Sequence, residues 1–61
     1  MKVSEILKKL KKGGCRFVEH GGEHDFWYSP ITDKEIQIPR HLAKELPTGT
    51  ANKILKDAGL K

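Results

Sequence analysis

Apolar residues recur with a helical period at the start of the chain. They follow the spacing i, i+3, i+4 and i+7, which is typical of an amphipathic helix with one buried stripe. The four positions are Val3, Ile6, Leu7 and Leu10. Lysine and glutamate fill the opposite face, and two consecutive glycines provide a C-terminal stop. The pattern predicts a first helix over residues 3–12.

The middle of the chain has the shorter period of β-strands. Residues 15–20 and 24–29 are rich in β-forming side chains and are separated by a turn that contains two glycines. Residues 35–38 alternate polar and apolar positions until Pro39, which stops the strand. Three consecutive strands joined by short turns predict an antiparallel meander.

A loop over residues 39–47, bracketed by two prolines, precedes a second helical pattern. Thr48 is a plausible N-cap, and Gly59 closes the helix with Leu60 folding back on the core. The apolar stripe consists of Ala51, Ile54, Leu55 and Ala58. The order is therefore α-β-β-β-α, an α+β fold in which both helices cover one face of a three-stranded antiparallel sheet. We expect residues 1–61 to form one domain.

Composition narrows the possible functions. The 61 residues carry twelve Lys and Arg against eight Asp and Glu, a formal net charge of +4. This balance suits nucleic-acid binding, although it also serves solubility in a small domain. The single cysteine excludes an intrachain disulfide, and no apolar run approaches the length of a membrane span. We therefore expect a cytoplasmic protein that does not contact a membrane.

His24 follows Gly21 and Gly22 at the mouth of an aromatic strand. The two glycines allow backbone angles that other residues resist, so a hairpin can bend here. Histidine exchanges protons near neutral pH, and RNA offers a 2′-OH beside each phosphate as a nucleophile. The residues alone leave two interpretations of His24: a general base, or a rim side chain that only hydrogen-bonds the hairpin.

The other candidate side chains are less specific. His20 is expected to be a solvated residue at a strand end, and His41 to be a second acid, a phosphate contact or a packing ring. Phe26 is expected in the core. Trp27 is then expected on the open face of the sheet, where it would stack on a base or pack against Val18 across the strands.

Metal binding is not expected. The soft-ligand residues Cys15, His20, His24 and His41 match no familiar zinc spacing. Proton transfer by a histidine needs neither a metal nor another cofactor, so we expect none.

Several segments, taken in order, resemble the HicA-type toxins of bacterial toxin–antitoxin systems. They are residues 14–18, the turn 22–24, the strand and exit 36–41, and three pieces of the closing stretch, residues 44–46, 49–50 and 54–60. The match covers nearly the whole chain, with two departures. Glu23 stands where the family often has serine or asparagine, and Cys15 stands where a larger apolar residue is usual.

The resemblance implies a fold of the double-stranded-RNA-binding type and an mRNA interferase that cleaves RNA with His24 as its catalytic residue. It also implies a HicB-type antitoxin as partner. The side chains expected to contact RNA are Lys8, Lys12, Trp27, Arg40, His41, Lys44, Lys53 and Lys56. Two other functions remain open: a non-catalytic double-stranded-RNA-binding module, and a protein-interaction domain that docks an acidic partner.

Overall fold

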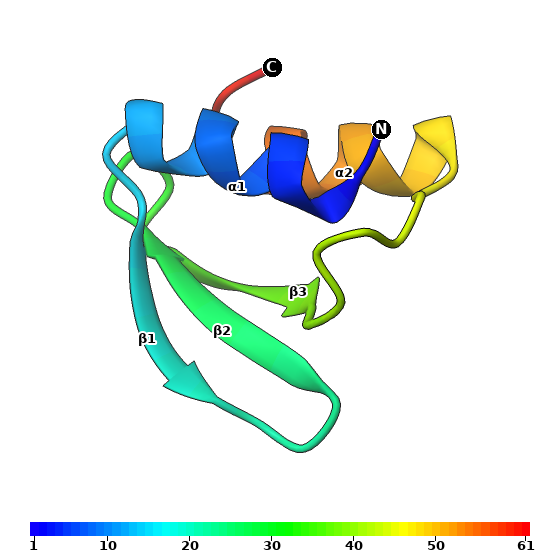
Figure 1. Cartoon of the computed structure of the whole chain (residues 1–61). Helices are drawn as coiled ribbons and strands as arrows, with labels where there is room; N and C mark the ends of the chain where they lie inside the picture. The colour runs from blue at the N-terminus through cyan, green and yellow to red at the C-terminus, as the bar shows by residue number, and fades with distance from the viewer.

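In the computed structural model, which describes residues 1–61, two helices and three strands follow the predicted order. They are α1 (Val3–Lys12), β1 (Arg16–His20), β2 (His24–Ser29), β3 (Lys34–Pro39) and α2 (Thr48–Asp57). Both helices lie on the same face of the sheet, and the β1–β2 hairpin extends away from them (Figure 1). The predicted α+β fold, a three-stranded antiparallel sheet covered by two helices, is confirmed.

Helix α1 has the predicted bounds, and its ends explain why it stops there. The N–H of Gly13 donates to the carbonyl of Lys9, and the N–H of Cys15 donates to the carbonyl of Leu10. Gly14 has a φ of 91°, a left-handed conformation that side chains with a Cβ resist. The chain therefore leaves the helix at the glycine pair and enters β1 directly.

The sheet is a meander in which β2 lies between β1 and β3. Its register is continuous between β2 and β3, where Trp27 pairs with Ile36. Between β1 and β2 the register shifts at Val18, which leaves Phe17 opposite Trp27 and Glu19 opposite Phe26. Such a bulge inserts one unpaired residue and bends the strand locally.

This register overturns the predicted faces of β2. Trp27 is 7% exposed and belongs to the core. Phe26 is only half-buried and lies on the open face of the sheet, together with His24 and Tyr28. Trp27 has this orientation because it pairs with Ile36, which also faces the helices. Its cross-strand partner is Phe17, not Val18. The predictions that Trp27 lies on the open face and that Phe26 belongs to the core are therefore wrong.

The core is formed by one cluster between the helices and the sheet. Its buried members are Val3, Ile6, Leu10, Cys15, Trp27, Ile36, Ile38, Leu46, Ala51, Ile54 and Ala58. The indole N–H of Trp27 is buried without a hydrogen-bond partner. The ammonium group of Lys11 lies 5.9 Å from the centroid of that indole, a cation–π contact from α1.

Helix α2 places its predicted apolar stripe in the core, and Leu60 packs back against it as expected. Its start differs by one position. Pro47 occupies the N-cap, no side chain caps the helix, and Thr48 is the first helical residue. The carbonyl of Pro47 accepts the first hydrogen bond of the helix, from Ala51. The prediction that Thr48 is the N-cap is therefore wrong.

The segment that links β3 to α2, residues 40–47, is here called the exit loop. It runs beside the start of α1, and two of its carbonyls accept hydrogen bonds from the first turn of that helix. The N–H of Val3 donates to Lys44 at 3.0 Å, and the N–H of Ser4 donates to Leu42 at 3.1 Å. These bonds satisfy amides that a helix leaves free at its N-terminus, and they anchor the exit loop.

Candidate functional site

His24 is the first residue of β2 and lies opposite Pro39 at the end of β3. Side chains alternate along a strand, so His24 and Trp27 occupy opposite faces of the sheet. The imidazole is exposed, while the backbone carbonyl of His24 accepts a hydrogen bond of 2.7 Å from the N–H of Gly21. The backbone is thus held at the point from which the imidazole projects.

The glycines before His24 act differently from the sequence-based expectation. Neither Gly21 nor Gly22 has a positive φ, so the turn does not use a conformation restricted to glycine. A Cβ on Gly21 would instead collide with the ring of Phe26. Any side chain at position 21 would therefore force the Phe26 ring to move, and the prediction of special backbone angles is wrong.

Two adjoining hollows meet at His24. The first has a volume of about 500 Å³ and lies between the hairpin and the exit loop. Its lining includes Gly22, Glu23, His24, Pro39, Arg40, His41 and Lys44. The second has a volume of about 450 Å³ and lies between β3 and α2. It is lined by His24, Glu35, Ile36, Gln37, Pro39, Thr50, Lys53, Ile54 and Asp57.

The fold therefore collects four of the predicted RNA-contacting side chains around His24, and they come from two separate segments. The exit loop supplies Arg40, His41 and Lys44, and α2 supplies Lys53. Lys44 and Lys53 form no ion pair within the chain, so both ammonium groups are available to a phosphate. Carboxylates also line the hollows, so the local charge is mixed.

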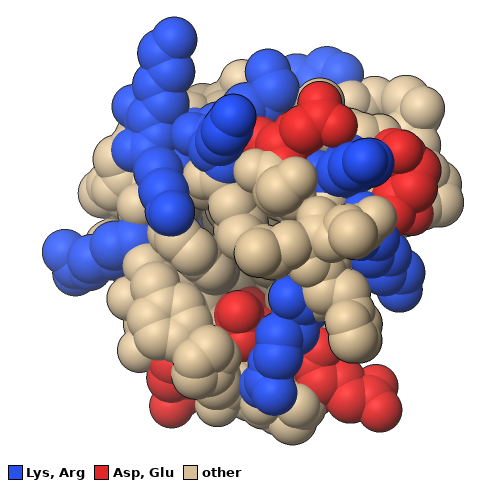
Figure 2. Space-filling view, viewed as in Figure 1, with Lys and Arg blue, Asp and Glu red and all other residues tan.

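The remaining predicted side chains lie elsewhere. Lys8 and Lys56 are exposed on the helices and line neither hollow, and Lys12 borders a different hollow between α1 and α2. Blue side chains crowd the helical layer in the upper part of Figure 2, interrupted by acidic ones. Trp27 is buried in the core, so its predicted role in base stacking is not compatible with the fold.

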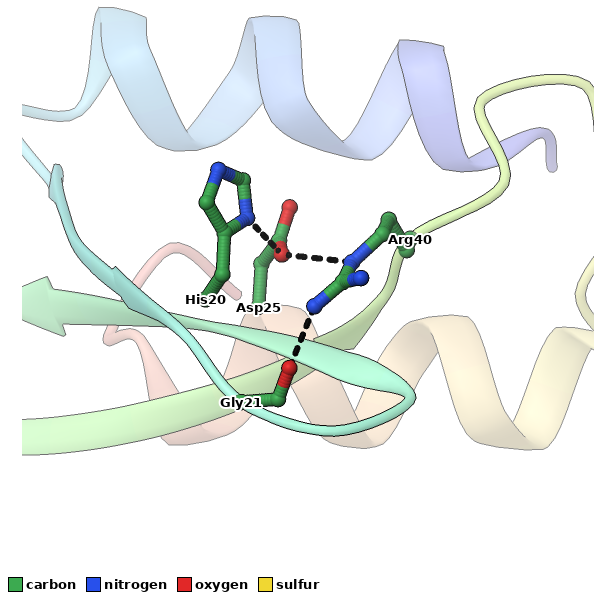
Figure 3. A network of polar contacts seen from close by, with 4 residues as sticks. All are labelled: His20, Gly21, Asp25 and Arg40. Atoms are coloured by element: carbon green, nitrogen blue, oxygen red, sulfur yellow. Dashed lines mark hydrogen bonds and ion pairs between the residues drawn. The ribbon is translucent and has the colours of Figure 1, made fainter.

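A polar cluster at the hairpin mouth was not predicted. Asp25 accepts hydrogen bonds at Oδ1 from Nδ1 of His20 at 2.6 Å and from Nε of Arg40 at 3.2 Å. A second guanidinium N–H of Arg40 donates to the carbonyl oxygen of Gly21. Figure 3 shows His20 from β1 and Arg40 from the exit loop meeting at one carboxylate oxygen of Asp25 on β2, while Arg40 also reaches the carbonyl oxygen of Gly21. We call these four residues the Asp25 cluster.

The Asp25 cluster changes the charge properties of its members. The hydrogen bond from His20, together with that from Arg40, lowers the pKa of Asp25 below its ordinary value of 3.8, although burial opposes the shift. The imidazole of His20 also packs on Phe17, with ring centroids 4.8 Å apart. His20 is exposed, as expected for a strand end, but it is a hydrogen-bonding member of the site.

The sequence contained one signal that would have pointed to this cluster. His20 and Asp25 stand close together in the sequence on either side of the glycine turn, and in the structure they pair across the hairpin. The predicted turn over residues 21–23 would have placed His20 opposite His24 instead, so the exact pairing came from the observed register. The bond from Arg40 had no comparable signal because Arg40 lies 15 residues from Asp25 in the sequence. The structure also shows no group of three His, Cys, Asp or Glu side chains arranged to hold a metal ion.

The comparison with known protein families agrees with this architecture. The sequence model described as the HicA toxin of bacterial toxin–antitoxin systems matches residues 3–60. The chain therefore belongs to the HicA toxin family, a family of ribonucleases whose members are paired with an antitoxin. No curated protein and no solved structure matches the chain. None of its helices has the length and apolar character needed to cross a membrane.

Proposed function

We propose that this toxin is a metal-independent endoribonuclease, an mRNA interferase, with His24 as its catalytic acid/base. The observation that carries the proposal is the exposed imidazole of His24 at the junction of two hollows that also hold Lys44 and Lys53. A proton-transfer group next to two unpaired cations suits the cleavage of a phosphodiester.

The chemistry requires only groups that the RNA and these side chains supply. His24, as a neutral imidazole, takes the proton from the 2′-OH, and the 2′-oxygen forms a bond to phosphorus. The bond from phosphorus to the 5′-oxygen breaks, and this oxygen leaves with a proton from solvent or from protonated His41 in the same hollow. The ammonium groups of Lys44 and Lys53 stabilise the charge that develops on the phosphoryl oxygens. The 5′ fragment then ends in a 2′,3′-cyclic phosphate.

The deciding experiment is RNA cleavage by the purified chain and by His24→Ala. Removing a general base typically costs 10²–10⁴-fold in rate. The exposed position of His24 predicts that the variant keeps its fold and its melting temperature. Cleavage by folded His24→Ala at the rate of the native chain would refute the assignment. Lys34→Ala, an exposed substitution at the start of β3 that lines neither hollow, is the comparison and should retain the native rate.

A non-catalytic double-stranded-RNA-binding module is the second candidate. It is favoured by the cations that lie away from His24, because Lys8, Lys12 and Lys56 spread positive charge over the helical layer. Such a module reads helix shape and phosphates and would not need His24. Binding of duplex RNA without any cleavage, unchanged in His24→Ala, would support this second function.

A further inference from the structure

The carboxylate of Asp25 connects the two arms of the hairpin mouth with the exit loop. His20, at the end of β1, and Arg40, at the start of the exit loop, both donate to its Oδ1. The side chain is only 17% exposed, so these contacts are partly shielded from water. An ion pair near the surface contributes to structure chiefly where several charged groups form one network, as His20, Asp25 and Arg40 do here.

The exit loop is anchored at its other side on α1. The carbonyls of Leu42 and Lys44 accept hydrogen bonds from the first turn of that helix. Arg40 is therefore the residue that ties the anchored loop to the hairpin, through Asp25 and the carbonyl oxygen of Gly21. The same loop supplies His41 and Lys44 to the hollow that His24 lines.

The backbone of His24 lies between two fixed points. Its own carbonyl accepts a hydrogen bond from Gly21, and the next residue in the chain is the clamped Asp25. We propose that Asp25 is a positioning residue, which acts through Arg40 to hold the imidazole of His24 at a fixed distance from His41 and Lys44. This proposal rests on the catalytic role of His24 proposed above. Misplacement of a catalytic group by about 1 Å can cost about a hundredfold in rate.

The proposal also changes the role of Arg40. Its guanidinium already donates through Nε and one terminal nitrogen within the chain, and Asp25 compensates its charge. Arg40 is thus a link between two parts of the site, while Lys44 and Lys53 contact the phosphate. A lysine at position 40 would keep the charge but could not make both contacts with the same fork geometry.

The test compares Asp25→Asn, Arg40→Gln and the double variant in single-turnover cleavage of a model RNA. Asp33→Asn is the matched control, because Asp33 also accepts a side-chain hydrogen bond, from Tyr28, but lies in the β2–β3 turn. Rates are expressed per folded molecule, with the folded fraction taken from circular dichroism. We expect the single-turnover rate at saturating toxin to fall about tenfold to a hundredfold for Asp25→Asn, with the toxin concentration that gives half of this rate little changed and the control unaffected.

Two further readouts separate positioning from a merely structural role. The double variant should lose no more activity than Asp25→Asn alone, because the two residues act as one unit. Arg40→Lys should lose less activity than Arg40→Gln, because it keeps the charge that pairs with Asp25. Relaxation of the His24 ring carbons, measured by NMR without RNA, should show greater mobility in Asp25→Asn than in the control.

The outcomes distinguish this proposal from the one on which it rests. Three results would each overturn the positioning role while leaving His24 as catalyst. They are full cleavage by folded Asp25→Asn, additive losses of activity in the double variant, and unchanged mobility of the His24 ring in Asp25→Asn. Undiminished cleavage by His24→Ala would instead refute the catalytic assignment, whatever Asp25→Asn does.

Discussion

The hydroxyl of Ser29 donates a hydrogen bond of 2.7 Å to the carbonyl oxygen of Ala58. Ser29 is completely buried at the end of β2, and Ala58 is completely buried at the end of α2. This bond joins the sheet to the helix that supplies Lys53 to the site, and it satisfies a carbonyl that a helix leaves free at its C-terminus.

Ser29→Ala should therefore destabilise the fold. The substitution leaves the Ala58 carbonyl buried without this donor, which costs about 1–3 kcal/mol in unfolding free energy. Urea denaturation of both proteins measures the difference. Ser4→Ala, the same substitution at a half-buried position in the first turn of α1, is the control and should change stability less. Equal stability of Ser29→Ala and the native chain would contradict this account.

Lys53 and Lys56 should contribute differently to activity. Replacing both with alanine should weaken RNA binding without unfolding, because both lie on the polar face of α2. Only Lys53 lines a hollow with His24, so Lys53→Ala alone should slow cleavage, whereas Lys56→Ala should not. For single-stranded RNA, each lost phosphate contact should make the slope of log affinity against log salt concentration shallower by roughly 0.7. Unchanged affinity and salt dependence in the double variant would place the RNA elsewhere, for example along Lys8 and Lys12.

Cleavage should persist in excess EDTA. The proposed route uses the imidazole of His24 and lysine charges, none of which requires a divalent ion. The measurement is the cleavage rate of the purified protein before and after chelation, with a metal-dependent nuclease as the control. Activity that disappears with chelator and returns with Mg²⁺ or Mn²⁺ would contradict the mechanism.

Stability should depend on pH through Asp25. Its pKa lies below the ordinary value of 3.8, so the folded state binds this proton less readily than the unfolded state does. The contribution to stability is therefore complete above that value and is lost as the pH falls through the lowered pKa. In urea titrations at several pH values, the difference in unfolding free energy between the native chain and Asp25→Asn should shrink in acid. A difference that stays constant with pH would show that Asp25 does not act this way.

A HicB-type antitoxin should bind over His24 and block cleavage. Acidic groups of the inhibitor would meet Lys44 and the cations around the site, since opposite charge speeds encounter and sets register. Because the antitoxin binds only the folded state, it should also raise the melting temperature of the toxin. Lys44→Glu should weaken the purified complex, whereas Lys9→Glu, beside the hollow between the two helices, should not. A tight complex that leaves cleavage intact would contradict occlusion of the site.

Local pattern was sufficient to predict the elements of this chain. The helical spacing of Val3, Ile6 and Leu10 predicted α1 with its observed bounds. The β-forming residues around the glycine turn predicted β1 and β2, and alternation over residues 35–38 predicted β3 of the antiparallel meander. These features depend on backbone preference and side-chain period, which neighbouring residues determine. His24 was identified in the same way, by its place beside the glycine turn and by resemblance to a ribonuclease family.

Pairing between distant segments decided what the local pattern left open. The register of β2 on β3 turned Trp27 into the core, and the bulge at Val18 brought Phe17 opposite it. Return of the exit loop to the hairpin joined Arg40 to Asp25. A one-residue change of register moves every side chain of a strand to the opposite face of the sheet. An ion pair between residues 15 positions apart leaves no periodic pattern in the sequence. The sequence by itself determined the elements and the candidate histidine, and the tertiary structure decided which side chains surround it.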